Sequence, residues 1–330
     1  MSTTPTTAND EAALQLDQKG NLRHLLTLKG IDKDLLIEIL DDAEQYLTTP
    51  GTLPARSQSL AGRTVANLFF EPSTRTRASF DLAGKRLGAD VLNLDVNTSS
   101  RKKGESILDT IYTLEAMQVD VMVVRDASAG VPAYIAQHVR DHVSILNAGE
   151  AEVSHPTQGL LDLLTIRQRK GRFEGLTVAI VGDIRHSRVA MSASQGLRTL
   201  GVGELRLISP PALAPDQEAV PGAKIVDNLV DGLAGADVVM ALRIQRERIG
   251  NLDGIPAIDE YFANYGISQE RLKLAAPDVI VMHPGPMNRG IEIESAVADG
   301  PRSVITQQVT NGVAVRMAVL DRVGRTMAAR

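Results

Sequence analysis

The sequence contains no cysteine and no tryptophan, and phenylalanine and tyrosine contribute five residues each to a chain of 330. Without cysteine there is no disulfide, no thiolate ligand for a metal and no cysteine nucleophile. Aromatic residues make up 3% of the chain, too few to predict a surface on which nucleic-acid bases stack. The missing residue types therefore argue against a disulfide-stabilised domain, a zinc-ribbon module and a single-strand nucleic-acid binder.

Long hydrophobic runs are absent as well. No stretch of eighteen apolar residues occurs, so no membrane span is predicted. Residues 1–20 lack the apolar core of a signal peptide, and they carry acids but no arginine, which argues against an organellar transit peptide. The cytoplasm is the simplest expected location.

The charge balance is mildly acidic, with 35 basic and 40 acidic residues and a net charge of −5. Such a chain has no overall attraction for nucleic acid or for anionic lipid, so neither is expected as a partner. If the protein binds an anion, a local basic cluster must do so. A cluster of this kind indicates a small-molecule site.

Strand-like and helix-like segments alternate from residue 63 onwards. The expected strands are 65–70, 91–94, 119–124, 143–146, 178–181, 205–208, 238–242 and 279–282, and the expected helices include 33–47, 104–117, 130–139, 157–169, 188–200 and 306–327. Short, continuously apolar strands separated by helices are typical of parallel sheets buried on both faces. The sequence therefore predicts an α/β protein with two doubly wound domains, their parallel sheets covered by helices.

A domain boundary is expected near residue 150. We predict a flexible N-terminal extension over 1–20, a first domain over 21–154 and a second over 155–305. The C-terminal helix, 306–330, is expected to pack back on the first domain. The sequence shows no internal repeat and no low-complexity tract.

Residues 63–77, RTVANLFFEPSTRTR, form the stretch around which the chain is organised. An apolar strand ends at Glu71-Pro72, because proline forces extended geometry on the residue before it. Ser73 and Thr74 are typical N-cap residues, and a helix that begins here presents free backbone N–H groups beside Arg75 and Thr76. This arrangement predicts a phosphate-binding turn. Ordinary helix capping with solvent-exposed arginines explains the same residues as well.

Polar side chains follow most of the other predicted strands, where ligands bind in open parallel sheets. They are Ser99, Lys102 and Lys103 in NTSSRKKGE, Arg125, His155 and Gln158 in HPTQ, Arg188, Arg243 and Gln245 in RIQRER, and His283 to Pro286 in HPGP. Each has an ordinary structural explanation: an edge charge, a surface loop, a helix-entry histidine, a solvated charge run or a simple turn. Arg188 near a helix start is electrostatically unfavourable unless a negative group lies opposite, which favours a functional role.

Together these residues predict a pocket that is rich in donors and poor in carboxylates, suited to a polyanion or to two anions. The histidines lack a partner at metal-ligand spacing, so neither a metal nor a cofactor is expected. The turn GDIRHSR lacks the pattern G-x-G-x-x-G, which argues against a nicotinamide-dependent oxidoreductase. Phosphoryl transfer needs a carboxylate that holds a metal, and none can be placed. Chemistry by positioning and charge stabilisation remains, with phosphate as a possible leaving group.

Five motifs together resemble the aspartate/ornithine carbamoyltransferase family. They are FFEPSTRTR (69–77), NTSSRKKGE (97–105), HPTQ (155–158), LRIQRER (242–248) and HPGPMNRG (283–290), and they occur in the family's order. The ornithine branch typically carries a cysteine in an H-C-L-P segment, whereas this chain has no cysteine and has R-x-Q at 243–245. The resemblance is therefore to the aspartate branch. It implies carbamoyl transfer from carbamoyl phosphate to L-aspartate, the committed step of pyrimidine synthesis, in a cleft between the two domains.

The resemblance also implies a role for each matching residue. Ser73, Thr74, Arg75 and Thr76 are expected to bind phosphate; Thr76, Arg125 and His155 to donate to the carbonyl oxygen; Gln158, Gly285 and Pro286 to orient the carbamoyl NH2; and Arg188, Arg243 and Gln245 to bind the aspartate carboxylates. Ser99 and Lys103 are expected to reach the site from the neighbouring subunit of a homotrimer. The catalytic group is thus Arg75, Thr76, Lys103, Arg125 and His155.

Three alternatives remain. One is a carbamoyltransferase for another amino acceptor such as ornithine. Another is a non-catalytic paralogue in a larger assembly, although a paralogue is expected to have lost Arg75, Arg125 or His155. A nicotinamide-dependent enzyme ranks last. In some bacterial relatives an N-terminal extension accompanies a dihydroorotase-like partner, so a higher assembly with that partner or with a regulatory subunit is a further expectation.

Overall fold

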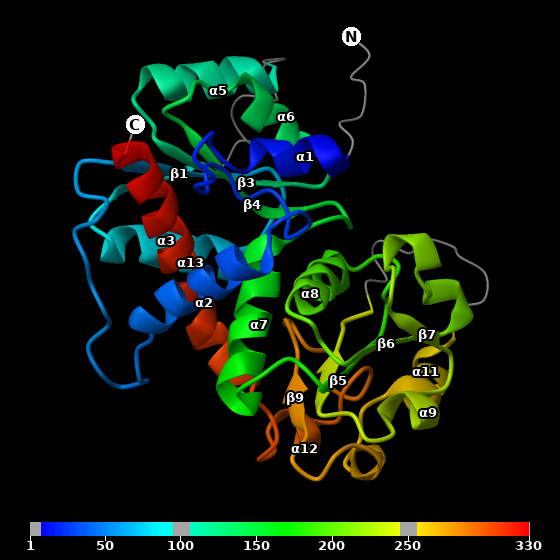
Figure 1. Ribbon diagram of the computed structural model, residues 1–330. Helices are drawn as coiled ribbons and strands as arrows, with labels where there is room; N and C mark the ends of the chain where they lie inside the picture. Colours follow the sequence, from blue (N-terminus) through cyan, green and yellow to red (C-terminus); the bar gives the residue numbers. More distant parts are fainter. Residues whose placement is uncertain (1–7, 95–105, 245–255, 330) are drawn as a thin grey trace. The chain divides into compact units, whose positions relative to one another are not determined.

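A computed structural model describes residues 8–94, 106–244 and 256–329. The chain divides into two compact units: Met1–Leu161 with Thr310–Arg330, and Asp162–Val309. Each unit contains one parallel sheet, of four strands in the first and five in the second (Figure 1). The predicted class, two α/β domains with parallel sheets covered by helices, is confirmed. The domain boundaries at 154/155 and 305/306 remain predictions.

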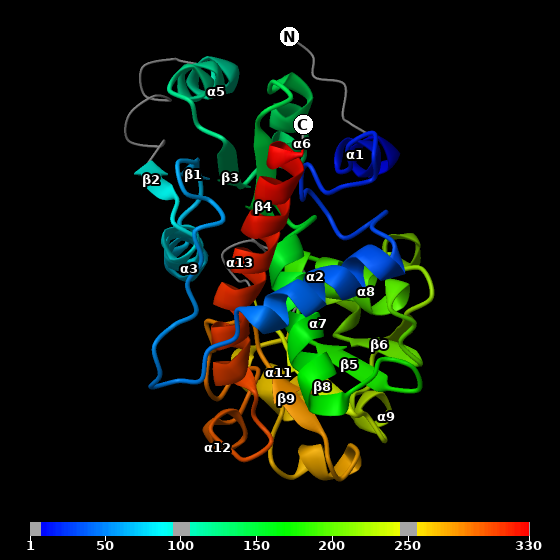
Figure 2. The ribbon, with the colours of Figure 1, turned by 60° about the vertical axis from the view of Figure 1, so that its left-hand side comes forward.

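The first unit's sheet has the strand order β2-β1-β3-β4. Its elements are α1 Ala8–Leu14, α2 Lys33–Gln45, β1 Thr64–Phe69, α3 Thr74–Arg86, β2 Asp90–Leu94, α5 Ile107–Ala116, β3 Val121–Asp126, α6 Val131–His138 and β4 Ser144–Glu150. Helices α5 and α6 cover one face of the sheet and α3 covers the other (Figure 2). Strands β1, β3 and β4 are almost entirely buried because both faces are covered, which explains their continuous apolar runs, whereas the edge strand β2 has no buried position.

Two strands of the first unit run further than the sequence analysis predicted. The strand predicted over 119–124 is β3, which continues to Asp126, and the strand predicted over 143–146 is β4, which continues to Glu150. The last pair, Asp126 and Glu150, follows a register shift after Val124. Polar residues can end these strands because their side chains are hydrogen-bonded, a condition that an apolar-run criterion does not detect.

The second unit's sheet has the strand order β7-β6-β5-β8-β9. Its elements are β5 Thr177–Val181, α8 Arg188–Thr199, β6 Glu204–Ile208, β7 Lys224–Val226, α9 Leu229–Leu233, β8 Val238–Ala241, α11 Ile258–Tyr265, β9 Ile280–Met282 and α12 Ser295–Ala298, with short 3-10 turns at Pro211–Leu213, Gln217–Ala219 and Arg271–Leu274. The sequence analysis missed β7. It is an edge strand of three residues with no buried position, and it is too short to show the hydrophobic periodicity by which strands are predicted.

Two long helices belong to both units along the chain: α7, Pro156–Lys170, and α13, Ile305–Ala328. Although α13 has 24 residues, none of the helices in the described ranges is long and apolar enough to cross a membrane. Part of the segment predicted to be mobile over 1–20 is also structured. Residues 8–14 form α1, and the buried Gln15 side chain accepts hydrogen bonds from the backbone N–H groups of Leu26 and Thr27. Because Gln15 is polar, hydrophobic patterns in the sequence do not predict that it fixes this segment to the first unit.

Ion pairs join α2 to α13 within the first unit. The Arg322 guanidinium donates to Asp42 at 2.7 Å and to Glu38 at 2.8 Å, and Arg325 donates to Asp42 at 2.6 Å. The Arg322 and Asp42 side chains are 15% and 16% exposed, so solvent screens their interaction only partly. The Tyr46 hydroxyl is also close, and burial, followed by the charge of Asp321, raises the pKa of Tyr46 to about 12.

We predict that Arg322→Met destabilises the first unit by about 1.5–3 kcal/mol, because the shielded Asp42 carboxylate loses two charged donors. Thermal and denaturant unfolding of the full chain measure the change. Lys85→Met is the matched control, since its ion pair with Asp81 is an exposed (i, i+4) pair on α3, worth about 0.3–0.5 kcal/mol. Equal effects of the two substitutions would contradict the prediction.

Candidate functional site

The chain reverses its winding direction between β1 and β3 of the first sheet. From β1 it adds β2 on one side, then returns to add β3 and β4 on the other. At such a switch point the loops after the two central strands diverge, and ligands bind outside the carboxyl ends of the strands. Residues 70–77 follow β1, and Arg125 pairs in register with Phe69 near the end of β3. The switch point therefore brings together the two parts of the first unit that carry the predicted phosphate and carbonyl ligands.

The turn after β1 leads directly into α3. Ser73 is the N-cap residue of this helix, yet its side chain makes no capping hydrogen bond. By contrast, the N-cap side chains Asp32, Ser106 and Ser187 of α2, α5 and α8 all accept hydrogen bonds from their own helices. The capping role expected of Ser73 is thus not observed. The first-turn N–H groups of α3 have no side-chain cap, a condition that favours an anion.

Arg75 and Thr76 differ in exposure although they are neighbours. Arg75 is exposed in the first turn of α3, while Thr76 is 7% exposed and faces inward. Phe80, one turn further along, is fully buried and lies under the Arg316 guanidinium at 5.2 Å from the ring centroid. Phe80 therefore anchors α3, and the first turn projects from a rigid element.

Arg125 is held firmly at the end of β3. Its guanidinium donates to the Ala148 carbonyl at 3.0 Å and to the Glu71 carboxylate at 3.1 Å, and the residue is 8% exposed. Glu71 lies in the turn after β1, so this ion pair links the two loops of the switch point. The sequence analysis did not assign a role to Glu71, because the pair spans 54 residues and leaves no local pattern.

His155 and Gln158 lie at the start of α7. Pro156 is the first helical residue, as expected of proline, and the His155 carbonyl accepts from the N–H groups of Gln158 and Gly159. The side chains of His155 and Gln158 are nearly buried, at 5% and 8% exposure. The predicted helix-entry position of His155 is therefore correct, and the residue is also shielded from solvent.

The second sheet has its own switch point, between β5 and β8. Arg188 begins α8 in the loop region after β5 and is 5% exposed, and Arg243 follows β8 and is half-buried. Gly182, directly after β5, has φ +142°, and a Cβ there would lie 2.7 Å from the Leu242 carbonyl oxygen. Only glycine lets the two strand ends approach this closely. The geometry places two guanidinium-bearing segments at one end of one sheet.

A buried carboxylate lies in the same loop as Arg188. Asp183 is fully buried, and its Oδ1 lies 2.8 Å from His186 Nδ1. The buried acid of this loop is thus paired with His186. Burial, followed by the charges of Glu292 and Asp183, raises the pKa of Tyr261 far above its usual range, so the phenol stays neutral. The sequence analysis did not single out Asp183 or Glu292.

The segment after β9 forms a turn that contains Gly285 and Pro286. The Gly285–Pro286 peptide bond is cis, and Gly285 has φ +66°. His283, at the start of the turn, is 1% exposed, whereas Pro286 is exposed. The turn thus has a buried histidine at its base and an accessible tip.

Three predicted site residues, Ser99, Lys103 and Gln245, lie outside the described residues. Among the residues that are described, no group of three or more histidine, aspartate or glutamate side chains has the geometry of a metal site. The described site residues are instead donors: guanidinium groups, hydroxyls, an imidazole and an amide. In each unit they occur at the carboxyl ends of the central strands or in the segments that follow the sheet.

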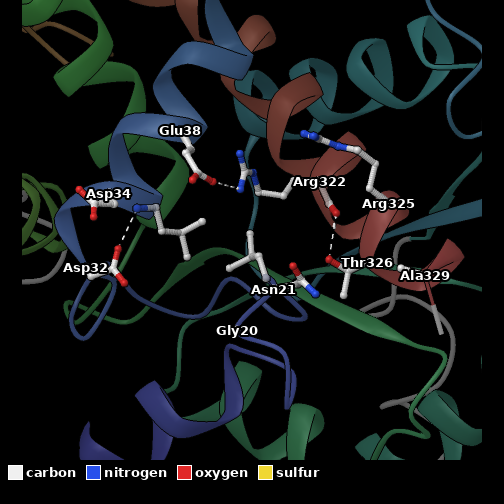
Figure 3. Close-up of a pocket in the computed structure, with 11 residues that line it drawn as sticks. Gly20, Asn21, Asp32, Asp34, Glu38, Arg322, Arg325, Thr326 and Ala329 are labelled. Carbon is white, nitrogen blue, oxygen red and sulfur yellow. Dashed lines mark hydrogen bonds and ion pairs between the residues drawn. The ribbon is translucent and has the colours of Figure 1, made fainter.

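A cavity of about 430 Å³ elsewhere in the first unit has a different character (Figure 3). Its lining includes Asp32, Asp34, Glu38, Arg322 and Arg325. Both arginines already form ion pairs with acids of α2, so the cavity offers an anion no uncommitted guanidinium. The motif residues, and not this cavity, form the candidate site.

Comparison with known proteins agrees with the geometry. Residues 23–168 match the family model described as "Aspartate/ornithine carbamoyltransferase, carbamoyl-P binding domain", and residues 174–323 match "Aspartate/ornithine carbamoyltransferase, Asp/Orn binding domain". These two ranges correspond closely to the parts that carry the two sheets.

Solved structures of both branches are similar to this chain. Aspartate transcarbamoylase from Trypanosoma cruzi, in complex with carbamoyl aspartate and phosphate, is 32% identical, with a TM-score of 0.80 over 91% of this chain and 95% of that one. Ornithine carbamoyltransferase from Thermus thermophilus is 27% identical, with a TM-score of 0.79 over 91% and 98%. Ornithine carbamoyltransferase from Pyrococcus furiosus is 28% identical, with a TM-score of 0.79 over 90% and 96%. Since both domain models match in order and the folds agree over nine-tenths of the chain, this protein belongs to the aspartate/ornithine carbamoyltransferase family.

Proposed function

We propose that this carbamoyltransferase is specific for L-aspartate and forms N-carbamoyl-L-aspartate and phosphate from aspartate and carbamoyl phosphate. The observation that carries the proposal is the pair Arg188 and Arg243 at the switch point of the second sheet. A guanidinium fork matches a carboxylate in shape and charge, and aspartate has two carboxylates. The reaction would supply the committed step of pyrimidine synthesis.

Most of the groups proposed to bind carbamoyl phosphate belong to the first unit. Ser73, Thr74, Arg75 and Thr76 bind the phosphate at the uncapped start of α3. Thr76, Arg125 and His155 donate to the carbonyl oxygen. Gln158 and the backbone of Gly285 and Pro286 orient the carbamoyl NH2. What supports these roles is the burial of Thr76, Arg125, His155 and Gln158, since shielded donors interact more strongly with charge.

The proposed reaction begins with attack of the neutral aspartate amine on the carbamoyl carbon. The carbonyl oxygen gains negative charge in the tetrahedral intermediate, where preorganised donors stabilise it. Re-formation of the carbonyl breaks the bond from carbon to the phosphate oxygen, and phosphate leaves with the electron pair. The amine proton passes to the departing phosphate, whose charge Arg75 stabilises, and Lys103 tunes this transfer. No metal or redox cofactor is needed to balance the step.

Ornithine is the alternative acceptor, because relatives of both branches resemble this chain. An ornithine side chain is cationic, and two arginines would repel it. A non-catalytic paralogue is less consistent with the sequence, which retains Arg75, Arg125 and His155. The acceptor loops of the second unit therefore favour aspartate.

The first test compares the two acceptors directly. With carbamoyl phosphate present, the purified chain is expected to form carbamoyl aspartate, and kcat/KM for aspartate should exceed that for ornithine by at least about 1,000-fold, because a charge reversal at a shielded site costs about 4 kcal/mol or more. Colorimetric detection of the ureido product measures both reactions. Comparable rates with ornithine would refute the proposed specificity.

The second test removes one acceptor-binding guanidinium. Arg243→Met is expected to raise KM for aspartate about 30- to 150-fold, the effect of losing a charged hydrogen bond of about 2–3 kcal/mol, and to leave KM for carbamoyl phosphate nearly unchanged. Arg185→Met is the matched control, since Arg185 follows β5, the strand that pairs with β8, but donates to the Ala214 carbonyl. A similar rise in both KM values would place Arg243 outside the acceptor site.

We also propose a homotrimer in which Ser99 and Lys103 complete the site of a neighbouring subunit, as the family resemblance implies. Arg75→Ala and Lys103→Ala should each abolish most activity. Mixed and reassembled, the two variants should regain activity, because some sites then receive an intact residue from each chain. Steady-state rates and solution mass test this, and absence of rescue in mixed trimers would refute sharing. A mass above the trimer with added dihydroorotase-like or regulatory chains would reveal the higher assembly.

A further inference from the structure

His283 and Glu292 form a buried pair to which the proposed chemistry gives no role. His283 Nε2 lies 3.3 Å from Glu292 Oε1, and the two side chains are 0% and 1% exposed. The other ring nitrogen, Nδ1, accepts a hydrogen bond from the backbone N–H of Gly285 at 2.8 Å. The ring therefore connects a buried carboxylate to the turn that contains Gly285 and Pro286.

This geometry determines the tautomer of His283. A backbone N–H can only donate, so Nδ1 must be the unprotonated, accepting nitrogen. In a neutral ring the hydrogen is then on Nε2, where it donates to Glu292. An imidazolium would place a second N–H opposite that of Gly285. The ring is accordingly neutral, with the hydrogen on Nε2 directed at the Glu292 carboxyl group.

Further hydrogen bonds hold both ends of the turn. The His283 N–H donates to Gln308 Oε1 at 2.9 Å, and Gln308 Nε2 donates to Asp162 Oδ1 at 2.7 Å. At the far end, the backbone N–H of Asn288 donates to Glu292 Oε1. The path of the backbone from His283 to Asn288 is thus determined by the same carboxylate at two points.

A buried carboxylate is energetically unfavourable without a cation nearby. Among the described residues, no lysine or arginine forms an ion pair with Glu292; its charged-group partner is the neutral His283 ring. A purely structural turn does not need a carboxyl group here, since a glutamine would fill the same space. The presence of a glutamate at this buried position therefore requires an explanation.

Polarisation of the turn provides one. A carboxylate that accepts from Nε2 makes Nδ1 a stronger acceptor, and hydrogen bonds in such a chain reinforce one another. The N–H of Gly285 belongs to the same peptide as the Pro284 carbonyl. When the N–H donates to a stronger acceptor, electron density shifts toward the carbonyl oxygen of that peptide. The oxygen then accepts more strongly.

We infer that Glu292 and His283 are positioning residues that orient and polarise the Pro284–Gly285 peptide, so that its carbonyl recognises the N–H groups of the carbamoyl substrate. The inference rests on the proposed function, in which this turn orients the carbamoyl NH2. It goes further by naming the buried residues that orient the carbonyl group of the turn. It also predicts that their contribution is confined to the amide end of the substrate.

Two probes separate the amide end from the phosphate end. Phosphonoacetamide carries a phosphonate and an amide NH2, whereas inorganic phosphate lacks the amide. We expect Glu292→Gln and His283→Gln to weaken phosphonoacetamide binding about tenfold, equivalent to about 1.4 kcal/mol, and to leave phosphate affinity unchanged. Calorimetric titration of the full-length protein measures both affinities. In steady-state kinetics, the same variants should raise KM for carbamoyl phosphate and leave Ki for phosphate unchanged.

The choice of substituent tests the path through Nδ1. In His283→Asn the amide oxygen can take the place of Nδ1 and accept from Gly285, so the loss should be only about threefold. In His283→Gln the amide reaches Glu292 but leaves the Gly285 N–H without this acceptor. Arg289→Gln is the control within the same segment, because Arg289 pairs with Asp299 on the exposed side, at 2.6 and 2.8 Å. It should change neither affinity.

Each result has a distinct meaning. An equal loss of affinity for phosphonoacetamide and for phosphate, or no loss of affinity for either, would overturn the inference. Equal effects of the two His283 substitutions on phosphonoacetamide affinity would overturn it too. Glu292→Gln preserves side-chain size and keeps the test valid if a His283 variant unfolds. Failure of the wild-type chain to form carbamoyl aspartate would refute the proposed function itself, a result separate from the ratio of the two affinities in the variants.

Discussion

The reversal of winding in each sheet is the constraint on which the site depends. The chain leaves β1 toward β2 and returns to β3, and it leaves β5 toward β6 and returns to β8. Loops that follow two adjacent central strands then diverge, and the strand ends between them remain open to a ligand. Every described arginine of the proposed site lies beside one of these two openings. The fold therefore determines which loops can bind substrate before any side chain is chosen.

Charge imposes the second constraint. A guanidinium that is shielded from water needs carbonyl or carboxylate partners, and Arg125 has both, in Ala148 and Glu71. These contacts fix its position at the end of β3. Arg75, in contrast, is exposed at the start of α3. The proposed site in the first unit thus combines a buried arginine with an exposed one.

The sequence was informative where the signal was local. Buried parallel strands and amphipathic helices have strong patterns, so most predicted elements agree with the structure to within a few residues. The patterns failed where a polar group depends on a distant partner. Gln15 anchors to residues 26 and 27, and Glu71 pairs with Arg125 across the sheet. Likewise, the unused capping capacity of Ser73 is visible only once its side-chain contacts are known.

The same distinction applies to the candidate site. Residue types after strands predicted the donors, because strand ends can be read from apolar runs. The buried acids of the neighbouring segments, among them Asp183 and Glu292, could not be predicted, since carboxylates are common on surfaces and only burial sets these apart. Glu292 lies nine residues from His283 with no recognisable spacing. Supporting residues are thus encoded by the fold as a whole.

The two sheets have different consequences for specificity. Both branches of the family share a carbamoyl-phosphate-binding domain and differ in the acceptor, so selection between acceptors belongs to the second domain. In the proposed function, two guanidinium groups at one switch point attract a dicarboxylate and repel a cation, and discrimination by repulsion needs no additional contact. In the proposed function, a carbonyl acceptor in the turn after β9 acts instead on the carbamoyl group, which is common to both reactions. Acceptor choice and carbamoyl recognition can therefore vary independently within the second domain.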